Sequence, residues 1–118
     1  SGGILPSHMS DIPLEFGSLE EYGCFVGSGG IVVFSDQDNI KQIVLNLLRF
    51  FAEESCGQCT PCRLGCDKLI NLTQHEMRDE VLIGDIISVM RDASICGLGQ
   101  AAPNPLSTAL RYMKSDLI

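Results

Sequence analysis

The sequence predicts a mainly α-helical domain, a four-helix bundle preceded by a short β and loop segment. Apolar residues after position 35 recur at three- and four-residue steps, the spacing of one helix face. The first 34 residues are instead rich in Gly, Ser and Pro, which favour turns. Between the first two helical patterns lies a loop with three cysteines at two successive three-residue steps, Cys56, Cys59 and Cys62. We expect this loop to carry the chemistry of the domain.

Composition narrows the class of protein. A chain of 118 residues with 45% hydrophobic content can bury one core. The net charge of -7 repels phosphate backbones, and the few Lys and Arg are scattered, so we expect no nucleic-acid partner. No apolar run reaches the roughly 18 residues of a membrane span, and no basic start leads into a secretion signal. We therefore expect a cytoplasmic protein without direct membrane insertion.

The N-terminal segment contains one clear strand pattern, Ile31-Val32-Val33-Phe34, bounded by glycines before it and by Ser35-Asp36 after it. One strand is too little for a sheet. The chain opens on Ser1 without an initiator Met, so we expect the missing β partners to lie in a longer natural polypeptide. The rival explanation is a cloning remnant, because Ser7-His8-Met9 resembles what a cleaved tag leaves behind.

The first two predicted helices flank the cysteine loop. The first starts at Ser35 or Asp36 and runs to near Glu54. The second starts at Thr60, whose hydroxyl is suited to cap the first turn, with Pro61 at a position where its missing N–H costs nothing. It runs to about Asn71.

Two further helices follow. Thr73-Gln74-His75-Glu76 has the pattern of a capping box, and a third helix continues to about Asp92. Gly84 lies inside this helix, where a glycine destabilises by about 1 kcal/mol relative to Ala. A close contact with another helix is an alternative reason for a glycine at this position. Asn104 and Pro105 are suited as cap and first residue of a fourth helix that reaches about Met113.

The cysteine loop is interpreted as an iron-sulfur site. Soft thiolates select iron-sulfur clusters, zinc or copper, and bacterial ferredoxins begin a 4Fe-4S site with the same Cys-x-x-Cys-x-x-Cys run. Zinc is the chief alternative, although zinc sites usually add a second, more distant Cys pair. Disulfides are disfavoured, because six cysteines without a secretion signal indicate a reducing compartment.

A cubane cluster needs a fourth ligand, which is Cys24, Cys66 or Cys96. Cys66 lies one turn along the second helix, and Cys24 lies among apolar residues, so both fit small buried residues. Cys96 precedes Gly97-Leu98-Gly99, where glycines let the backbone approach a cluster and aim N–H groups at its sulfurs. We expect Cys96 to be the fourth ligand.

Three stretches resemble the flavin-binding NADH-dehydrogenase subunits of respiratory complex I, NAD-linked formate dehydrogenases and NAD(P)-linked hydrogenases. They begin at Gly27, Glu54 and Ser94, and read GSGGIVV, ESCGQCTPCR and SICGLG. The resemblance implies that Cys56, Cys59, Cys62 and Cys96 ligate one 4Fe-4S cluster. It also implies that residues 1–34 end a β-grasp-like middle domain and that residues 35–118 form the helical iron-sulfur domain. The segment Gly2-Gly3-Ile4-Leu5-Pro6 fits the family too, which argues against the tag.

The resemblance further implies a role in electron relay. FMN and NAD(H) would bind in an N-terminal part that is missing here, so the fragment is not catalytic alone. Its partners would be its own flavin domain, a thioredoxin-like 2Fe-2S subunit and a further iron-sulfur or catalytic subunit. The run from Cys96 to Pro105 resembles formate dehydrogenases and hydrogenases more than respiratory complex I. We expect a formate dehydrogenase β subunit, with a complex I or hydrogenase subunit as the alternative. The alternative of another class is a zinc-stapled interaction module. An iron-sulfur DNA-binding regulator is disfavoured by the acidic charge.

Overall fold

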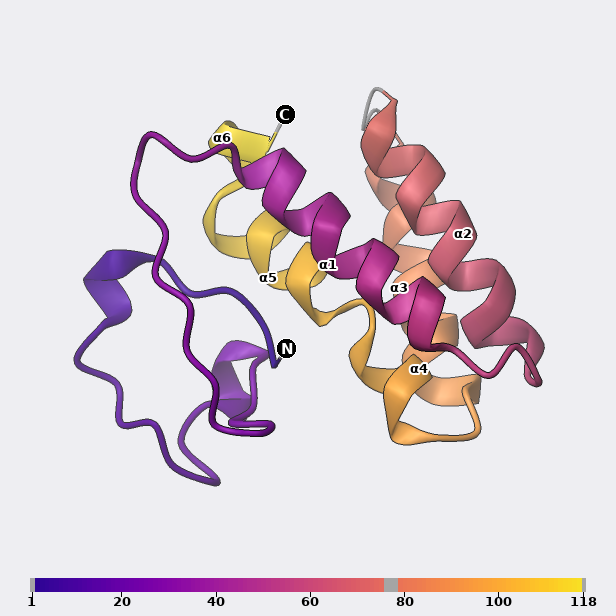
Figure 1. The fold of residues 1–118 in the computed structure, drawn as a ribbon, viewed down its shortest axis with the longest axis horizontal. Coiled ribbons are helices and arrows are strands. Elements are labelled where there is room, and N and C mark those ends of the chain that lie inside the picture. The colour runs from indigo at the N-terminus through magenta and orange to yellow at the C-terminus, as the bar shows by residue number, and fades with distance from the viewer. Residues whose placement is uncertain (1, 76–78, 118) are drawn as a thin grey trace.

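The computed structural model describes residues 2–75 and 79–117, and every regular element in these ranges is a helix (Figure 1). Two 3-10 turns, Ser7–Met9 and Glu20–Tyr22, interrupt the N-terminal segment. The α-helices are α1 (Ile40–Glu54), α2 (Thr60–Gln74), α3 (Glu80–Ala93), α4 (Gly97–Ala101), α5 (Asn104–Tyr112) and α6 (Lys114–Leu117). The prediction of a mainly α-helical domain is confirmed. None of these helices is both long enough and apolar enough to cross a membrane.

The first helix begins later than Ser35 or Asp36, and this prediction was wrong. Residues 35–38 fold into a turn of their own, in which the Ser35 N–H donates to the Asp38 carboxylate at 2.8 Å. The Asn39 side chain then caps α1 by accepting from the Gln42 N–H at 3.1 Å. The Asp38 and Asn39 side chains thus accept bonds from nearby backbone N–H groups. These local bonds replace helical ones, so the helix does not extend back through residues 35–39.

The second and third helices differ from prediction at the segment that joins them. α2 starts at Thr60 as expected, but Cys59 is the capping residue and the Thr60 hydroxyl makes no cap bond. Thr73 does not open a capping box: it lies in the last turn of α2, where its buried hydroxyl donates to the Leu69 carbonyl at 2.7 Å. The predicted continuation, Glu76 to Arg78, lies outside the described residues. The Asp79 side chain caps α3 instead.

The fourth predicted helix corresponds to α5. Asn104 is its first residue, not its cap, and the Asn104 amide oxygen accepts from the Arg91 guanidinium at 3.1 Å. Two short helices, α4 and α6, were not predicted, because each is only about one turn long and shows too little periodicity.

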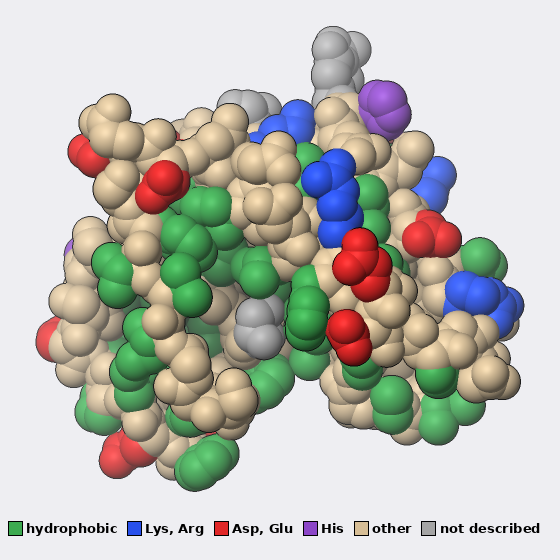
Figure 2. Space-filling model, in the orientation of Figure 1, with side chains coloured by type: hydrophobic (Ala, Val, Ile, Leu, Met, Phe, Trp, Pro, Cys, Tyr) green, Lys and Arg blue, Asp and Glu red, His purple; other side chains and the backbone are tan. Residues whose placement is uncertain are grey.

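The predicted strand Ile31–Phe34 does not form: within the described chain these residues are extended and belong to no sheet. Their side chains are largely exposed, with 65% of Ile31, 75% of Val32 and 88% of Val33 accessible. Figure 2 shows hydrophobic side chains gathered over the N-terminal segment. A strand needs a neighbour for its backbone N–H and C=O groups, and no described residue supplies one.

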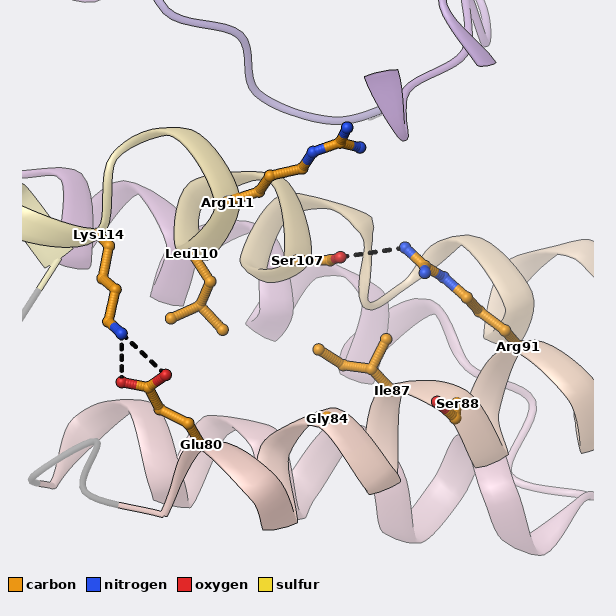
Figure 3. Close-up of a pocket in the computed structure, with 9 residues that line it drawn as sticks. All are labelled: Glu80, Gly84, Ile87, Ser88, Arg91, Ser107, Leu110, Arg111 and Lys114. Carbon is orange, nitrogen blue, oxygen red and sulfur yellow. Dashed lines mark hydrogen bonds and ion pairs between the residues drawn. The ribbon is translucent and has the colours of Figure 1, made fainter. Parts of the chain in front are cut away.

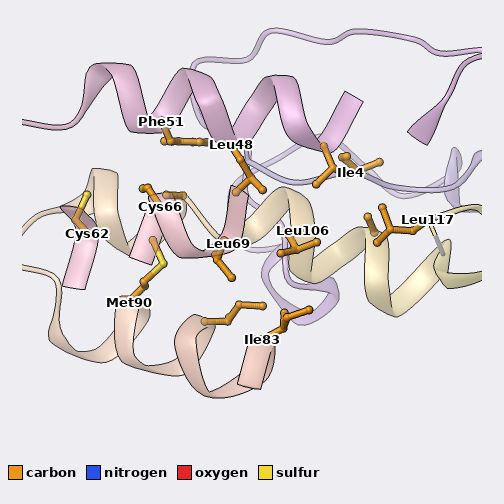
Figure 4. Packing of buried hydrophobic residues seen from close by; sticks show 14 residues of the cluster. Ile4, Leu48, Phe51, Cys62, Cys66, Leu69, Ile83, Met90, Leu106 and Leu117 are labelled. Carbon is orange, nitrogen blue, oxygen red and sulfur yellow. The ribbon is translucent and has the colours of Figure 1, made fainter. Parts of the chain in front are cut away.

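One hydrophobic core joins the helices. α1 packs on α2 and α5, and α2 packs on α3 (Figure 1). The core includes Leu48, Leu69, Met90 and Leu106, each fully buried (Figure 4). Burial of side chains of this size stabilises a fold by about 1.5–3 kcal/mol each. The core includes Cys62 and packs against Cys59, and therefore forms the base on which the cysteine loop rests.

The N-terminal segment is attached to the helices through α5. The buried Ile4 N–H donates to the Thr108 hydroxyl at 2.9 Å, and the Tyr112 hydroxyl donates to the Tyr22 carbonyl at 3.0 Å. The Ile4 side chain joins the same core as the helices. Ile4 and Tyr22 thus anchor the N-terminal segment to α5.

Candidate metal centre

The three-cysteine loop spans the turn from α1 to α2. Gly57 has a positive φ of +73°, a conformation in which a side chain is strained, so it lets the chain reverse after Cys56. Cys59 occupies the N-cap position of α2 without a side-chain cap bond, and Cys62 lies in the first turn of the helix. The Arg63 guanidinium donates to the Gly57 carbonyl at 2.6 Å and holds the loop against the helix. The loop therefore presents three thiols around the positive end of α2, which favours thiolates.

Cys59 is the residue at which the two cysteine loops meet. The backbone N–H of Ile95, and after it that of Cys62, lie close to its sulfur and hold the pKa of the Cys59 thiol below its ordinary value. Ile95 immediately precedes Cys96 in sequence. The contact therefore brings the loop of Cys96 to the start of α2, although Cys96 lies 37 residues further along the chain than Cys59.

Cys62 is buried where these loops rest on the core, with 5% of its surface exposed. Its sulfur lies 3.2 Å from the Ser55 hydroxyl. On another side it approaches Gly99: a Cβ atom on that glycine would lie 2.9 Å from the Cys62 Cβ and 2.5 Å from the Ser94 hydroxyl oxygen. Only a glycine at position 99 leaves room for this approach.

Cys56 and Cys96 are both exposed at the edge of this region. Cys96 caps α4, and a Cβ on the following Gly97 would meet no described atom within 4 Å. Open space next to Cys96 agrees with a loop that leaves room for a bulky inorganic group.

Cys66 and Cys24 are buried, as expected for small core residues. Burial, together with the neighbouring Cys62 thiol, raises the pKa of Cys66 to about 12, so it stays protonated. Burial also raises the pKa of Cys24, which lies beside Gly3 of the N-terminal segment and near Thr108 of α5. Cys24 lies by the N-terminal contact with α5, whereas Cys66 remains close to Cys62.

The residues present fit a thiolate-ligated cluster. In the described ranges no three His, Cys, Asp or Glu side chains already stand in the geometry of a bound metal ion. The donor set is nevertheless soft and reduced, since the cysteines are free thiols. In addition, the buried Ser94 hydroxyl beside Cys62 has no hydrogen-bond partner among the described residues, so it is available to a further acceptor. Sequence reasoning missed Ser94, Ser55 and Ile95, because a loop contact leaves no periodic signal.

Two surface cavities have no cysteine in their lining, although Thr60 and Pro61 of the cysteine loop line the first. An apolar groove of about 360 Å³ between α2 and α3 is lined by Leu64, Gly65 and Val89. A second groove of about 410 Å³ lies between α3 and α5 (Figure 3). The Glu80–Lys114 ion pair closes one of its ends and Arg91 lies at the other. Neither groove contains a cysteine.

This helical domain joins a Cys-x-x-Cys-x-x-Cys loop to a second loop that contains a further cysteine. Such an arrangement belongs to the class of helical iron-sulfur-binding domains. Residues 42–118 match the family described as the NADH-ubiquinone oxidoreductase-F iron-sulfur binding region. The chain belongs to this family, and the suspected resemblance and the 4Fe-4S cofactor are confirmed.

Curated relatives and solved structures agree with this assignment. The chain is 33% identical to the F subunit of NADH-quinone oxidoreductase from Rickettsia rickettsii, over 97% of this chain and 28% of that protein. It is 31% identical to the HndC subunit of the NADP-reducing hydrogenase from Solidesulfovibrio fructosivorans, over 93% and 24% respectively. It also superimposes on an NAD+-reducing NiFe-hydrogenase in the H2-reduced state with a TM-score of 0.82 and 31% identity, over 98% of this chain and 21% of that one. The chain thus spans about a quarter of the length of the relatives it matches.

Proposed function

We propose that this chain is the electron-relay domain of an NAD-linked flavoprotein subunit, with Cys56, Cys59, Cys62 and Cys96 as ligands of one 4Fe-4S cluster. The observation that carries the proposal is the approach of Gly99, three residues after Cys96, to Cys62: a Cβ on Gly99 would lie 2.9 Å from the Cys62 Cβ, so the two cysteine loops are in contact. The bound cluster would supply one-electron transfer. The chain's own residues bind it through thiolates, exclude water with the core beneath Cys62 and offer N–H and O–H donors.

Cys96 is proposed over Cys66 as the fourth ligand for two reasons. Cys66 is 1% exposed and faces the core, where Leu69 and Met90 are its neighbours in the buried cluster. Burial disfavours a charged thiolate at this position, and it raises the pKa of the Cys66 thiol for the same reason. Cys96 is exposed at the mouth of the site and next to the open space at Gly97, so it can turn toward a cluster at little cost.

The proposal extends to the parent chain. We propose that residues 1–34 end a β-grasp-like middle domain and that residues 35–118 form the iron-sulfur domain. The exposed, extended run Ile31–Phe34 supports this, because its apolar side chains and unpaired backbone fit an added sheet. FMN and NAD(H) would bind in the N-terminal part of the parent, so electrons would pass from the flavin through this cluster.

The relatives support a multi-subunit setting, since they are named as subunits of an NADH-quinone oxidoreductase and of a hydrogenase. We propose as partners the flavin domain of the same chain, a thioredoxin-like 2Fe-2S subunit and a further iron-sulfur or catalytic subunit, in the cytoplasm. Within the family we propose a formate dehydrogenase β subunit, because of the run from Cys96 to Pro105. A complex I or hydrogenase subunit is the alternative.

The test is anaerobic reconstitution followed by iron and acid-labile sulfide analysis and EPR of the reduced protein. We expect about four irons and four sulfides per chain, as in a cubane cluster. Cys96→Ser should lose the intact cluster, whereas Cys66→Ser should keep it. Cys24→Ser is the control, because Cys24 lies away from the cysteine loops, and it should also keep the cluster. Zinc without sulfide would contradict the electron-relay function. Loss in Cys66→Ser with retention in Cys96→Ser would overturn the ligand set alone.

A further inference from the structure

The Ser94 hydroxyl is a buried polar group without a partner. Ser94 is 6% exposed, and its Oγ makes no hydrogen bond to any described residue. The rest of the residue is satisfied: its N–H donates to the Met90 carbonyl at 3.2 Å, and its carbonyl accepts from the Gln100 side-chain amide at 3.1 Å. A buried hydroxyl without a partner destabilises a fold. Such a group in a well-formed loop therefore points to an acceptor that the chain itself does not provide.

This hydroxyl lies beside Cys62. Ser94 Oγ and Cys62 Cβ lie 2.5 and 2.9 Å from the same point, the place where a Cβ on Gly99 would stand. The hydroxyl is therefore next to Cys62 and is separated from it by a residue without a side chain. Any longer residue at position 99 would fill the space between the two groups.

A second hydroxyl approaches Cys62 from the other loop. Ser55 Oγ lies 3.2 Å from the Cys62 sulfur and accepts a hydrogen bond from the Gly57 N–H, also at 3.2 Å. A serine hydroxyl has one hydrogen and two lone pairs, so the bond from the Gly57 N–H leaves the Ser55 hydrogen free, and a thiolate at Cys62 can only accept it. Cys62 is thus flanked by hydroxyl groups from both loops, whereas Cys56 and Cys96 are exposed.

We propose that Ser94 donates an O–H···S hydrogen bond to the corner of the cluster that Cys62 holds, and that it thereby raises the reduction potential of the cluster. The inference rests on the proposed function. The cluster gains negative charge when it accepts an electron, so a donor to its sulfur stabilises the reduced state more than the oxidised state. No proton is transferred, since the hydroxyl hydrogen stays on its oxygen while the cluster gains one electron.

The test is a redox titration of the reconstituted domain, followed by EPR, on the wild type, Ser94→Ala and the control Ser88→Ala. Ser88 is an exposed residue of α3 in the groove away from the cysteines. We expect Ser94→Ala to lower the reduction potential of the cluster. The equilibrium constant for one-electron reduction should fall about three- to tenfold, and a tenfold change corresponds to about 59 mV. Ser88→Ala should leave the potential at the wild-type value. Ser55→Ala should lower it in the same direction.

A spectroscopic measurement separates hydrogen bonding from a general structural effect. In D2O, pulsed EPR of the reduced wild type should show an exchangeable deuteron coupling that is absent from Ser94→Ala and present in Ser88→Ala. In the protein without a cluster, Ser94→Ala should raise the denaturation midpoint, because it removes a buried hydroxyl without a partner.

Each failure has a distinct meaning. An unchanged potential and an unchanged deuteron coupling in Ser94→Ala would overturn the inference and leave the proposed function intact. Failure of Ser94→Ala to assemble the cluster, while Ser88→Ala assembles it, would also overturn the inference, since Ser94 would then be needed for binding. Failure of the wild type to assemble any cluster would instead contradict the proposed function.

Discussion

Gly65 of α2 and Met90 of α3 are in direct contact: a Cβ on Gly65 would lie 2.5 Å from the Met90 sulfur. Both residues are buried, so the two helices meet here through a glycine backbone and a core side chain. The contact lies one turn from Cys62 on α2 and close to the end of α3 that leads to Ser94. It therefore sets how closely the two cysteine loops approach each other.

Gly65→Ala should destabilise the domain by about 1–3 kcal/mol, because overpacking forces Met90 or the helices to move. The matched control is Gly84→Ala in α3, where an added Cβ would meet no described atom within 4 Å. Gly84→Ala should stabilise by up to about 1 kcal/mol through helix propensity alone. Urea denaturation measures both. Equal effects of the two substitutions would show that the Gly65 contact is not tight.

Arg91 links α3 to the start of α5 through hydrogen bonds to the Asn104 amide oxygen at 3.1 Å and the Ser107 hydroxyl at 3.2 Å. Arg91→Met should cost about 1–2 kcal/mol of unfolding free energy, since the half-buried Asn104 contact loses a charged donor. Lys114→Met is the comparison, because its ion pair with Glu80 is about half exposed on both sides. It should cost under about 1 kcal/mol. A larger loss in Lys114→Met would contradict this ranking.

The cysteines of the cluster-free protein should differ in reactivity. The N–H groups near Cys59 lower its thiol pKa, while burial raises the pKa of Cys66 to about 12. Because the thiolate is the nucleophile, Cys59 should react with iodoacetamide at a lower pH than an ordinary cysteine. Cys66 should stay unmodified through about pH 9 while the protein is folded. Peptide mass spectrometry across about pH 6–10 measures both rates, with protein in urea as the control in which the difference disappears.

Attachment of the N-terminal segment should depend on Thr108. Its hydroxyl accepts from the Ile4 N–H at 2.9 Å in a buried setting. Thr108→Val keeps the shape of the side chain but leaves that N–H without a partner, so we expect a loss of about 1–3 kcal/mol. Tyr112→Phe removes only the partly buried bond to the Tyr22 carbonyl and should cost less. Urea denaturation measures the loss of unfolding free energy in both variants. Limited proteolysis should cleave the chain before residue 26 faster in Thr108→Val than in Tyr112→Phe.

The helical periods predicted α1, α2, α3 and α5, because one apolar face per helix is a local pattern of the chain. The residue types that soft metal centres require likewise identified the cysteine loop. Helix ends were predicted less well. Ser35, Thr60 and Thr73 all have side chains that cap helices, yet each makes a different bond in the structure. Which of several local bonds forms depends on packing, which short windows of sequence do not contain.

The sequence by itself therefore determined the helical class, the thiolate chemistry and the family of this protein. Only the tertiary structure decided that Ile95 meets Cys59, that Cys66 faces the core and that Ser94 lies beside Cys62. It also showed that Ile31–Phe34 remains without a strand partner in the described chain. The physical reason is distance along the chain. Contacts between loops more than about 30 residues apart depend on how α2 and α3 pack, and that packing is decided by Gly65, Met90 and the shared core.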